Sequence, residues 1–283
     1  MSSLAWSSVV QTPEAMFAHR AMRFRLANDC AFKRLFSLPD SGRLVDVGCG
    51  SGGCCMALRR LYPNANIVGV DNDSSHLMFA RKHVPNVTFE CRDFRCWAPR
   101  VSFDGALAFS MFGFVPAEPL FACLAKIVQY GGSVSLVSVV NRTETGFNPA
   151  ELATPKTGRF LKRLDASIEH LSPVTRGRSD PNYAISLAAR NGLRLIAVRQ
   201  ERFAFSEFDT DYASVVLPAL IAIRKSRLDT AWRSARCRAK TQYLLCLREI
   251  AGARAYRNPL VSKKWKMTET IQSIVFSRLD QIQ

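Results

Sequence analysis

Short apolar stretches alternate with segments of helical length through the middle of the chain. The apolar stretches are rich in Val, Leu and Phe and are bounded by Gly, Pro or Asp, as buried strands are. They predict strands over residues 43–48, 66–71, 87–93, 103–110 and 132–140. The segments between them predict helices over 53–62, 74–83 and 119–130, with Gly131 and Gly132 as the stop of the last one. A further helix and strand are expected within 182–203.

This alternation of strands and helices predicts an α/β fold with a doubly wound, mostly parallel sheet. Parallel strands are joined by right-handed helical crossovers, which cover both faces of the sheet. Ligands of such sheets bind outside the carboxyl ends of the strands, at the point where the strand order reverses. The ends of the predicted strands are therefore the place to look for a site.

A glycine-rich turn follows the first predicted strand, in the sequence LVDVGCGSGG over residues 44–53. Gly48, Gly50 and Gly53 satisfy the dinucleotide-binding pattern G-x-G-x-x-G, and Asp71 lies near the position where that pattern places its acid. The glycines indicate a nucleotide-like ligand, because a turn without Cβ atoms lets the ligand approach the backbone closely. They do not by themselves distinguish a dinucleotide from other ligands of this kind.

The acids at the strand ends distinguish between these ligands. Asp46, Asp71 and Asp93 each end or follow a predicted strand, and Ser110 follows the fourth. A pyrophosphate would be repelled by such a rim, whereas S-adenosylmethionine (SAM) has no phosphate and carries an α-ammonium and a sulfonium. A unit-charge pair about 4 Å apart is worth about 4 kcal/mol at an effective dielectric of about 20, so the sign of the charge matters. The rim favours SAM over NAD, with a dinucleotide oxidoreductase as the rival.

The ordered series VDVGCGSG, VGVDND, CRDF, FDGALAFS and KIVQYGGSVSLVS resembles the motifs of class I SAM-dependent methyltransferases. The resemblance covers about residues 45–140 and implies a seven-stranded Rossmann-like sheet whose last strand, within 268–279, inserts antiparallel beside the fifth. It assigns the ribose hydroxyls to Asp71 and the adenine to Asp93 and Phe94. The whole set of residues expected to bind the cofactor is Asp46, Gly48, Cys49, Gly50, Gly52, Asp71, Asn72, Asp93, Phe94 and Ser110.

Composition and charge narrow the class of protein further. The 283 residues contain nine cysteines with no C-x-x-C pair, so no metal site is predicted, and reduced thiols indicate a cytoplasmic enzyme. No apolar run is long enough for a membrane span, and the first residues do not resemble a signal peptide. The formal net charge is +16, and residues 219–283 carry much of it. This basic region leaves open an RNA-modifying methyltransferase, although an Arg-rich solvated helical face is the preferred interpretation.

The layout of the whole chain is similar to the juvenile hormone acid O-methyltransferases of arthropods. That resemblance implies an N-terminal helical lid segment over 1–36, a SAM-binding core over 37–204, a helical cap insertion over 205–262 and a final strand returning to the core over 263–283. The acceptor it implies is the carboxylate of a farnesoic or juvenile-hormone-acid-like terpenoid or fatty acid. The chain departs from that family in two places: Gly113 and Phe114 stand where it has a His-Trp pair, and His19 stands near its N-terminal glutamine.

Methyl transfer to an ionised carboxylate needs positioning more than acid–base chemistry. His19 is expected to orient the acceptor, and Phe112, Phe114 and Phe147 are expected to line an apolar pocket. With a phenol or amine as acceptor, His19 would instead serve as a base. A non-catalytic SAM-binding relative is the remaining alternative, because of the altered Gly113-Phe114 pair. The sequence does not indicate an oligomeric state.

Overall fold

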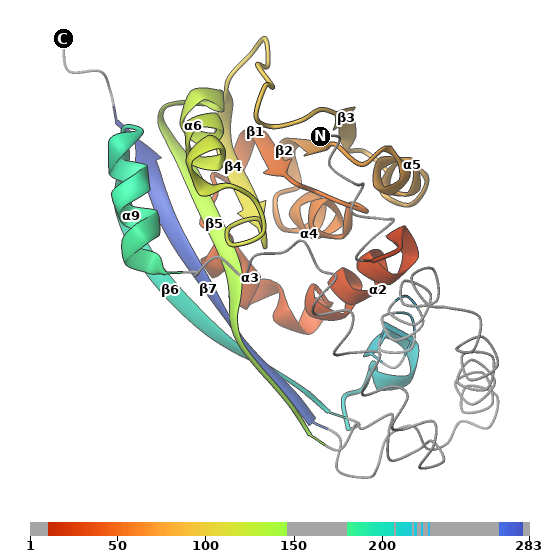
Figure 1. The fold of residues 1–283 in the computed structure, drawn as a ribbon. Helices are drawn as coiled ribbons and strands as arrows, with labels where there is room; N and C mark the ends of the chain where they lie inside the picture. The colour runs from red at the N-terminus through yellow and green to blue at the C-terminus, as the bar shows by residue number, and fades with distance from the viewer. Residues whose placement is uncertain are drawn as a thin grey trace, which may run out of the picture. The chain divides into compact units, whose positions relative to one another are not determined.

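The computed structural model describes residues 11–145, 180–206, 208–216 and 266–279, with a few positions between 218 and 226. The chain divides into two compact units, and Figure 1 shows the elements of both. One unit comprises residues 1–22, 142–173 and 204–269, and the other comprises 23–141, 174–203 and 270–283. The second unit, which we call the core unit, contains most of the sheet.

In chain order, the helices and strands of the described residues are α2 (Pro13–Arg23), η1 (Leu26–Asn28), α3 (Asp29–Phe36), β1 (Ser41–Val47), α4 (Gly53–Leu61), β2 (Asn64–Asp71), α5 (Ser74–His83), β3 (Thr88–Cys91), β4 (Phe103–Phe109), α6 (Ala117–Ile127), β5 (Val128–Thr145), α9 (Pro181–Arg190), β6 (Leu193–Ser206), η2 (Tyr212–Val216) and β7 (Lys266–Arg278).

The sheet has seven strands in the order β3-β2-β1-β4-β5-β7-β6. Strands β1 to β5 pair in parallel, and β7 runs antiparallel between β5 and β6 (Figure 1). The prediction of a doubly wound, seven-stranded, mostly parallel sheet is confirmed, and so is the placement of the last strand beside the fifth. The strand order reverses between β1 and β4, which puts the expected ligand position at the carboxyl end of β1.

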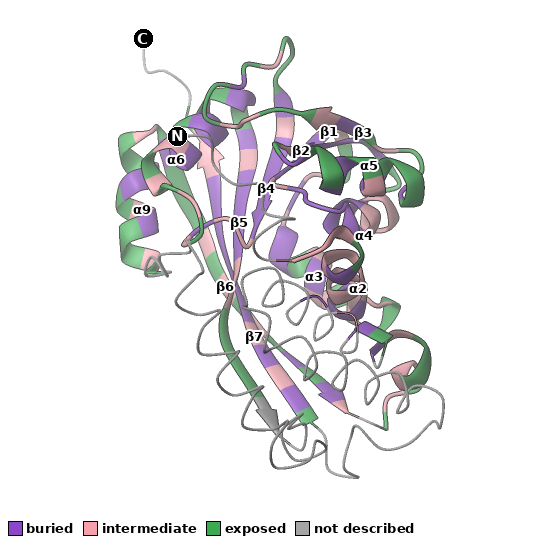
Figure 2. Cartoon of the chain, turned by 45° about the vertical axis from the view of Figure 1, so that its right-hand side comes forward, coloured by how far each residue is buried: buried purple, intermediate pink, exposed green. Residues whose placement is uncertain are grey.

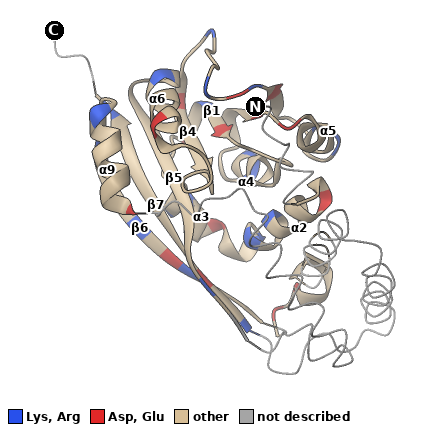
Figure 3. Ribbon diagram, in the orientation of Figure 1, with Lys and Arg blue, Asp and Glu red and all other residues tan. Residues whose placement is uncertain are grey.

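Helices cover both faces of this sheet, with α3, α4 and α5 on one side and α6 and α9 on the other (Figures 1 and 2). The central strands are accordingly buried at consecutive positions, as the burial patterns of β1 and β4 show. Strands buried on both faces lose the alternation of apolar and polar residues, which is why apolar residues follow one another in the buried parts of β1 and β4. Basic side chains end several helices, including α6 and α9, where they complement the helix dipole (Figure 3).

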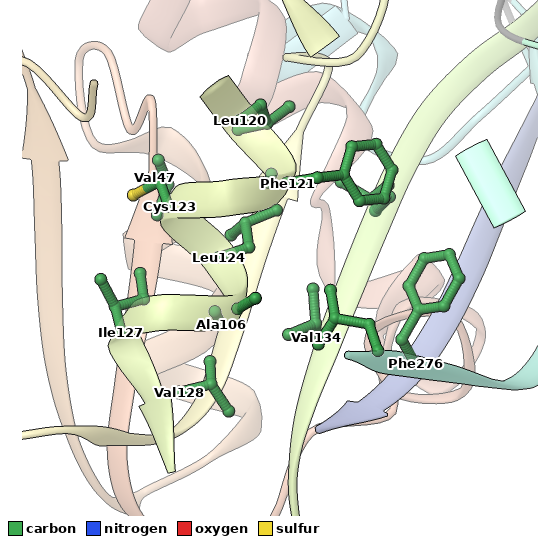
Figure 4. Packing of buried hydrophobic residues seen from close by; sticks show 14 of the residues in the cluster. Val47, Ala106, Leu120, Phe121, Cys123, Leu124, Ile127, Val128, Val134 and Phe276 are labelled. Carbon is green, nitrogen blue, oxygen red and sulfur yellow. The ribbon is translucent and has the colours of Figure 1, made fainter. Parts of the chain in front are cut away.

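On the α6 side, the apolar face of the helix packs onto β4, β5 and β7 (Figure 4). Leu120, Phe121 and Leu124 point at the sheet, and the ring of Phe121 meets Phe276 of β7 edge-on with centroids 6.1 Å apart. This contact fastens the last strand to a helix that precedes it by far in the sequence.

The other face holds a cluster of phenylalanines that the sequence analysis did not identify. Phe24 and Phe32 contact Phe109 of β4, with ring centroids 5.2 and 6.5 Å apart, and Phe36 packs against both of them. Phe32 also stacks on Phe203 of β6 at 4.7 Å. The cluster joins three segments that are distant in the chain.

One boundary differs from the sequence prediction. The helix expected over 119–130 ends at Ile127, and β5 begins at once with Val128, so Gly131 and Gly132 lie inside the strand and are not a helix stop. The pairing of β4 with β5 shifts register between Phe103 and Gly105, opposite these glycines. A Cβ on Gly132 would lie 2.9 Å from the carbonyl oxygen of Asp104, and Gly131 has a φ of 74°. The two glycines therefore allow the strand to form a bulge.

Candidate cofactor site at the carboxyl edge of the sheet

The turn between β1 and α4 is held against the end of β2 by backbone hydrogen bonds. The amides of Gly48 and Cys49 donate to the carbonyl oxygen of Val70 at 2.7 and 3.1 Å. Gly48, Gly50 and Gly52 have φ values of 74°, 53° and 79°, which side chains rarely allow. A Cβ on Gly48 would also lie 2.1 Å from the sulfur of Met111. Glycine is therefore required at these positions by the backbone conformation and, at Gly48, by the close packing of Met111.

Asp71, at the end of β2, connects this turn to the next one. Its Oδ2 accepts the amide of Gly50 at 2.8 Å, and its Oδ1 accepts the amide of Asp73 at 2.9 Å. Burial raises the pKa of the Asp71 carboxyl, while these two amides and the charge of His76 act in the opposite direction. A carboxylate has about four acceptor positions, so two remain for a ligand.

Asp46 lies one residue before the end of β1 and is 1% exposed. The thiol of Cys55, in the first turn of α4, donates to its Oδ2 at 3.3 Å. Burial raises the pKa of Cys55, and it raises the pKa of Cys49 to about 11. The two thiols near Asp46 are therefore neutral.

The third acid, Asp93, follows β3 and forms an ion pair with Arg95. The Nε of Arg95 donates to both Asp93 oxygens at 2.9 Å, and these hydrogen bonds lower the pKa of Asp93. Asn72 is exposed beside Asp71, and Phe94 is partly buried against the apolar cluster of the sheet. The expected adenine-binding pair is thus in place at the edge of the sheet, with Arg95 on the carboxylate of Asp93.

The segment after β4 turns sharply at Ser110, which has a φ of 56° and donates its amide to the carbonyl oxygen of Val137 at 2.7 Å. Phe112 is buried and packs into the core, with its ring 6.0 Å from that of Phe121 and 6.4 Å from that of Tyr183. Phe114 remains 46% exposed. Of the two phenylalanines expected to line an acceptor pocket here, Phe114 faces solvent while Phe112 supports the turn from within.

The structure brings together the residues expected to bind the cofactor. Asp46, Asp71 and Ser110 end or follow the neighbouring strands β1, β2 and β4, and Asp93 follows β3. Two other predicted residues are not part of this arrangement. His19 lies in α2, which belongs mainly to the other unit, and Phe147 lies outside the described residues.

Three buried polar residues beside the turn were missed by the sequence analysis. Ser51 shares a hydrogen bond of 2.6 Å with Nδ1 of His76, and Asp73 caps α5 by accepting the amides of Ser75 and His76. Asp73 Oδ2 lies 4.0 Å from Nε2 of His76. An acid just before a predicted helix is a recognisable cap signal, but nothing in the sequence pairs Ser51 with His76.

Comparison with known proteins shows what this part of the chain is similar to. Residues 44–132, which contain the glycine turn and all three acids, match a family model described as a methyltransferase domain. The core has the class I methyltransferase fold. The chain is also similar to Haemonchus contortus phosphoethanolamine N-methyltransferase 2, solved in complex with SAM. That likeness has a TM-score of 0.53 at 13% identity, covers 99% of this chain and 61% of that one, and shows the fold alone.

Curated relatives of the chain align over stretches of similar length. A trans-aconitate 2-methyltransferase of Variovorax paradoxus is 35% identical over 109 residues, which cover 38% of this chain and 42% of that protein. A ubiquinone biosynthesis O-methyltransferase of Bradyrhizobium sp. is 30% identical over 125 residues, covering 43% and 49%. The chain thus spans less than half the length of these relatives. They support the resemblance to class I methyltransferases but not the one to juvenile hormone acid enzymes in particular.

The described helices include none with the length and apolar character needed to cross a membrane.

Proposed function

We propose that this protein is a SAM-dependent O-methyltransferase acting on a small molecule. The observation that carries the proposal is the set of three acids at the ends of neighbouring strands beside the glycine turn, within a segment that matches a methyltransferase domain. The rim suits a ligand that bears an ammonium and a sulfonium, and it would repel the pyrophosphate of a dinucleotide.

The turn offers SAM hydrogen-bonding groups as well as charge. The space beside Gly48 is filled by the side chain of Met111, so glycine lets the turn pack closely onto the segment after β4. Gly52 caps α4 without a side-chain hydrogen bond, which leaves amides at this helix end available to a carboxylate. The two free acceptor positions of Asp71 match the two ribose hydroxyls.

In this proposal, the other residues expected to bind the cofactor would take the following roles. Asp46 would contribute the negative charge that attracts the ammonium, and Asp93 with Phe94 would hold the adenine. Cys49, Gly50, Asn72 and Ser110 would complete the wall around the ligand. The bound cofactor would supply an activated methyl group, and the chain would hold the acceptor oxygen in line with it and exclude water.

For the acceptor, we propose the carboxylate of a small acid, with an apolar terpenoid or fatty acid as the finer assignment. Relatives named for trans-aconitate indicate that a carboxylate acceptor is compatible with this core. The exposed ring of Phe114 after β4 supplies apolar surface beside the edge of the sheet. Phe112, which is buried beneath the turn after β4, would support this surface from within.

A carboxylate is ionised at neutral pH, so its methylation requires no base with a pKa near 7. Opposite charges on acceptor and sulfonium are neutralised as the methyl group moves, which is why a dry site favours the reaction. The work of the protein in this proposal is to orient the acceptor and to keep out water.

Two measurements test the proposal in sequence. Calorimetry of the purified chain should show binding of SAM and of its demethylated product S-adenosylhomocysteine, and no binding of NAD. Incubation with methyl-labelled SAM and a panel of tricarboxylic, terpenoid and fatty acids should then yield a methyl ester, detected by mass spectrometry. NAD binding without SAM binding would refute the cofactor assignment. Labelling of tRNA, a phenol or an amine in place of every acid would refute the acceptor assignment alone.

A further inference from the structure

The second half of the glycine turn has one side chain through which the protein can fix it. Residues 50–53 read Gly-Ser-Gly-Gly, so Ser51 is the single residue of this stretch with a side chain. Its neighbours Gly50 and Gly52 have φ values of 53° and 79°, a conformation that glycine adopts freely but also leaves freely. A side-chain restraint on this stretch therefore acts through Ser51.

The side chain of Ser51 is buried and points to α5. Its Oγ lies 2.6 Å from Nδ1 of His76, and each residue is 1% exposed. Buried hydroxyl and imidazole groups need hydrogen-bond partners, and here each serves the other. The short distance shows that the hydroxyl and the imidazole are held close together.

His76 is itself held by the turn between β2 and α5. It lies in the first turn of α5, and its amide donates to the cap Asp73 at 3.4 Å. The ring nitrogen Nε2 lies 4.0 Å from the other oxygen of the same carboxylate, and Asp73 is also buried. The imidazole is therefore hydrogen-bonded to Ser51 through Nδ1, and its Nε2 faces the carboxylate of Asp73.

The same two turns are joined a second time through Asp71. Its oxygens accept the amides of Gly50 and Asp73, one from each turn. Two hydrogen bonds thus hold neighbouring residues of the turn: the carboxylate proposed to bind ribose holds Gly50, and His76 holds Ser51. Because the two residues are adjacent, a shift of one would displace the other.

We propose that His76 is a positioning residue for cofactor binding, acting through Ser51 to hold the glycine turn in the shape that receives SAM. It touches neither the cofactor nor the acceptor, and it lowers the entropy that the turn must lose on binding. This inference rests on the proposed function, and it deepens it by naming what orders the cofactor turn.

The experiment compares SAM dissociation constants of the full chain and of matched variants by calorimetry. Ser51→Ala and His76→Leu should each weaken SAM binding by about 5- to 30-fold, the effect of losing one buried hydrogen bond. His76→Asn, whose side-chain amide can reach the position of Nδ1, should stay within about threefold of the parent. His83→Asn changes another histidine of the same helix, outside the network, and should leave binding unchanged.

The double variant Ser51→Ala/His76→Leu decides whether the two residues act as a unit. It should bind SAM no more weakly than the worse single variant, because both remove the same interaction. The acceptor KM should stay at the parent value, and amide hydrogen exchange of residues 48–53 should rise in Ser51→Ala, which removes little packing volume. A merely structural role of His76 would lower the melting temperature without this split between cofactor and acceptor.

The outcomes separate this inference from the proposed function. Failure of the parent chain to bind SAM would refute the proposed function. Normal SAM binding by Ser51→Ala and His76→Leu, or multiplication of the two effects in the double variant, would overturn the role of His76 and leave the proposed function intact.

Discussion

At the scale of single residues, the carboxylate of Asp71 serves the fold and the proposed ligand together. It accepts one amide from each of two turns, and burial raises its pKa, so the ionised form is held at a cost. The structure tolerates this charge at a place where a neutral side chain would be easier to bury. That is the pattern expected of a binding group rather than of a purely structural one.

Replacement of Asp71 by asparagine tests this dual role. Asp71→Asn should raise the SAM dissociation constant by at least about 30-fold, because charge-assisted hydrogen bonds to the ribose hydroxyls are worth roughly 2–3 kcal/mol together. Calorimetry measures the affinity, and circular dichroism checks that the variant is folded. Asp104→Asn is the matched control, since Asp104 accepts the amide of Arg43 near the opposite ends of β1 and β4. Unchanged SAM affinity in folded Asp71→Asn would remove the ribose assignment.

The cysteines provide a second residue-scale prediction. All seven cysteines in the described part of the chain are free, and Cys30, Cys91 and Cys96 are exposed. Cys49 is buried and its pKa is raised to about 11, so its reactive thiolate is scarce at pH 8. Iodoacetamide at pH 8 should therefore alkylate the three exposed thiols and spare Cys49 and Cys55, as read by peptide mass spectrometry. The same reaction in guanidinium is the control, and equal labelling of Cys49 and Cys91 without denaturant would contradict the burial.

At the scale of helices and strands, the phenylalanine cluster holds together elements that are distant in the sequence. Phe32 is fully buried, stacks on Phe203 and meets Phe24 edge-on. Phe32→Ala should lower the free energy of unfolding of the core unit by about 3–5 kcal/mol, through lost burial and the cavity left behind. Urea unfolding followed by circular dichroism measures this change. Leu26→Ala, at a position 73% exposed in the preceding 3-10 helix, should stay within about 0.5 kcal/mol of the parent.

The sequence predicted these elements well wherever local chemistry determines them. The helix expected over 74–83 is found as Ser74–His83, and the first strand, expected over 43–48, is found as Ser41–Val47. Prediction failed at the start of β5, because the bulge at Gly131 depends on pairing with β4 and not on the glycines themselves. For the site, the glycine turn and the acids were found from the sequence because each follows an apolar run. The bond between Ser51 and His76 was not, because it joins two segments through tertiary contact alone.

At the scale of the whole molecule, the net charge acts on an approaching acceptor at longer range than any contact. The chain carries 39 Lys and Arg against 23 Asp and Glu, a formal net charge of +16. A field of this sign attracts an anionic acid from solution, while the local rim of carboxylates receives a cationic cofactor. The two ligands of the proposed reaction should therefore respond to salt in different ways.

Ionic strength tests this directly. Raising salt from about 50 to 500 mM shortens the Debye length from roughly 14 to 4 Å, so kcat/KM for an anionic acid should fall several-fold. The SAM dissociation constant, measured in parallel, is the internal control and should change by less than about twofold, because its contacts lie within a few ångströms. A kcat/KM that is insensitive to salt would show that long-range attraction plays no part in acceptor capture.

The order of the strands along the chain also has a consequence for biosynthesis. β7 is made after β6 but lies between β5 and β6, so a chain emerging from the ribosome carries both neighbours before the strand that joins them exists. Until then the edges of β5 and β6 that β7 will occupy have unpaired backbone groups, which can pair with other chains. Nascent chains halted before residue 266 should therefore depend on chaperones, and release of the last strand should be the step that ends this dependence.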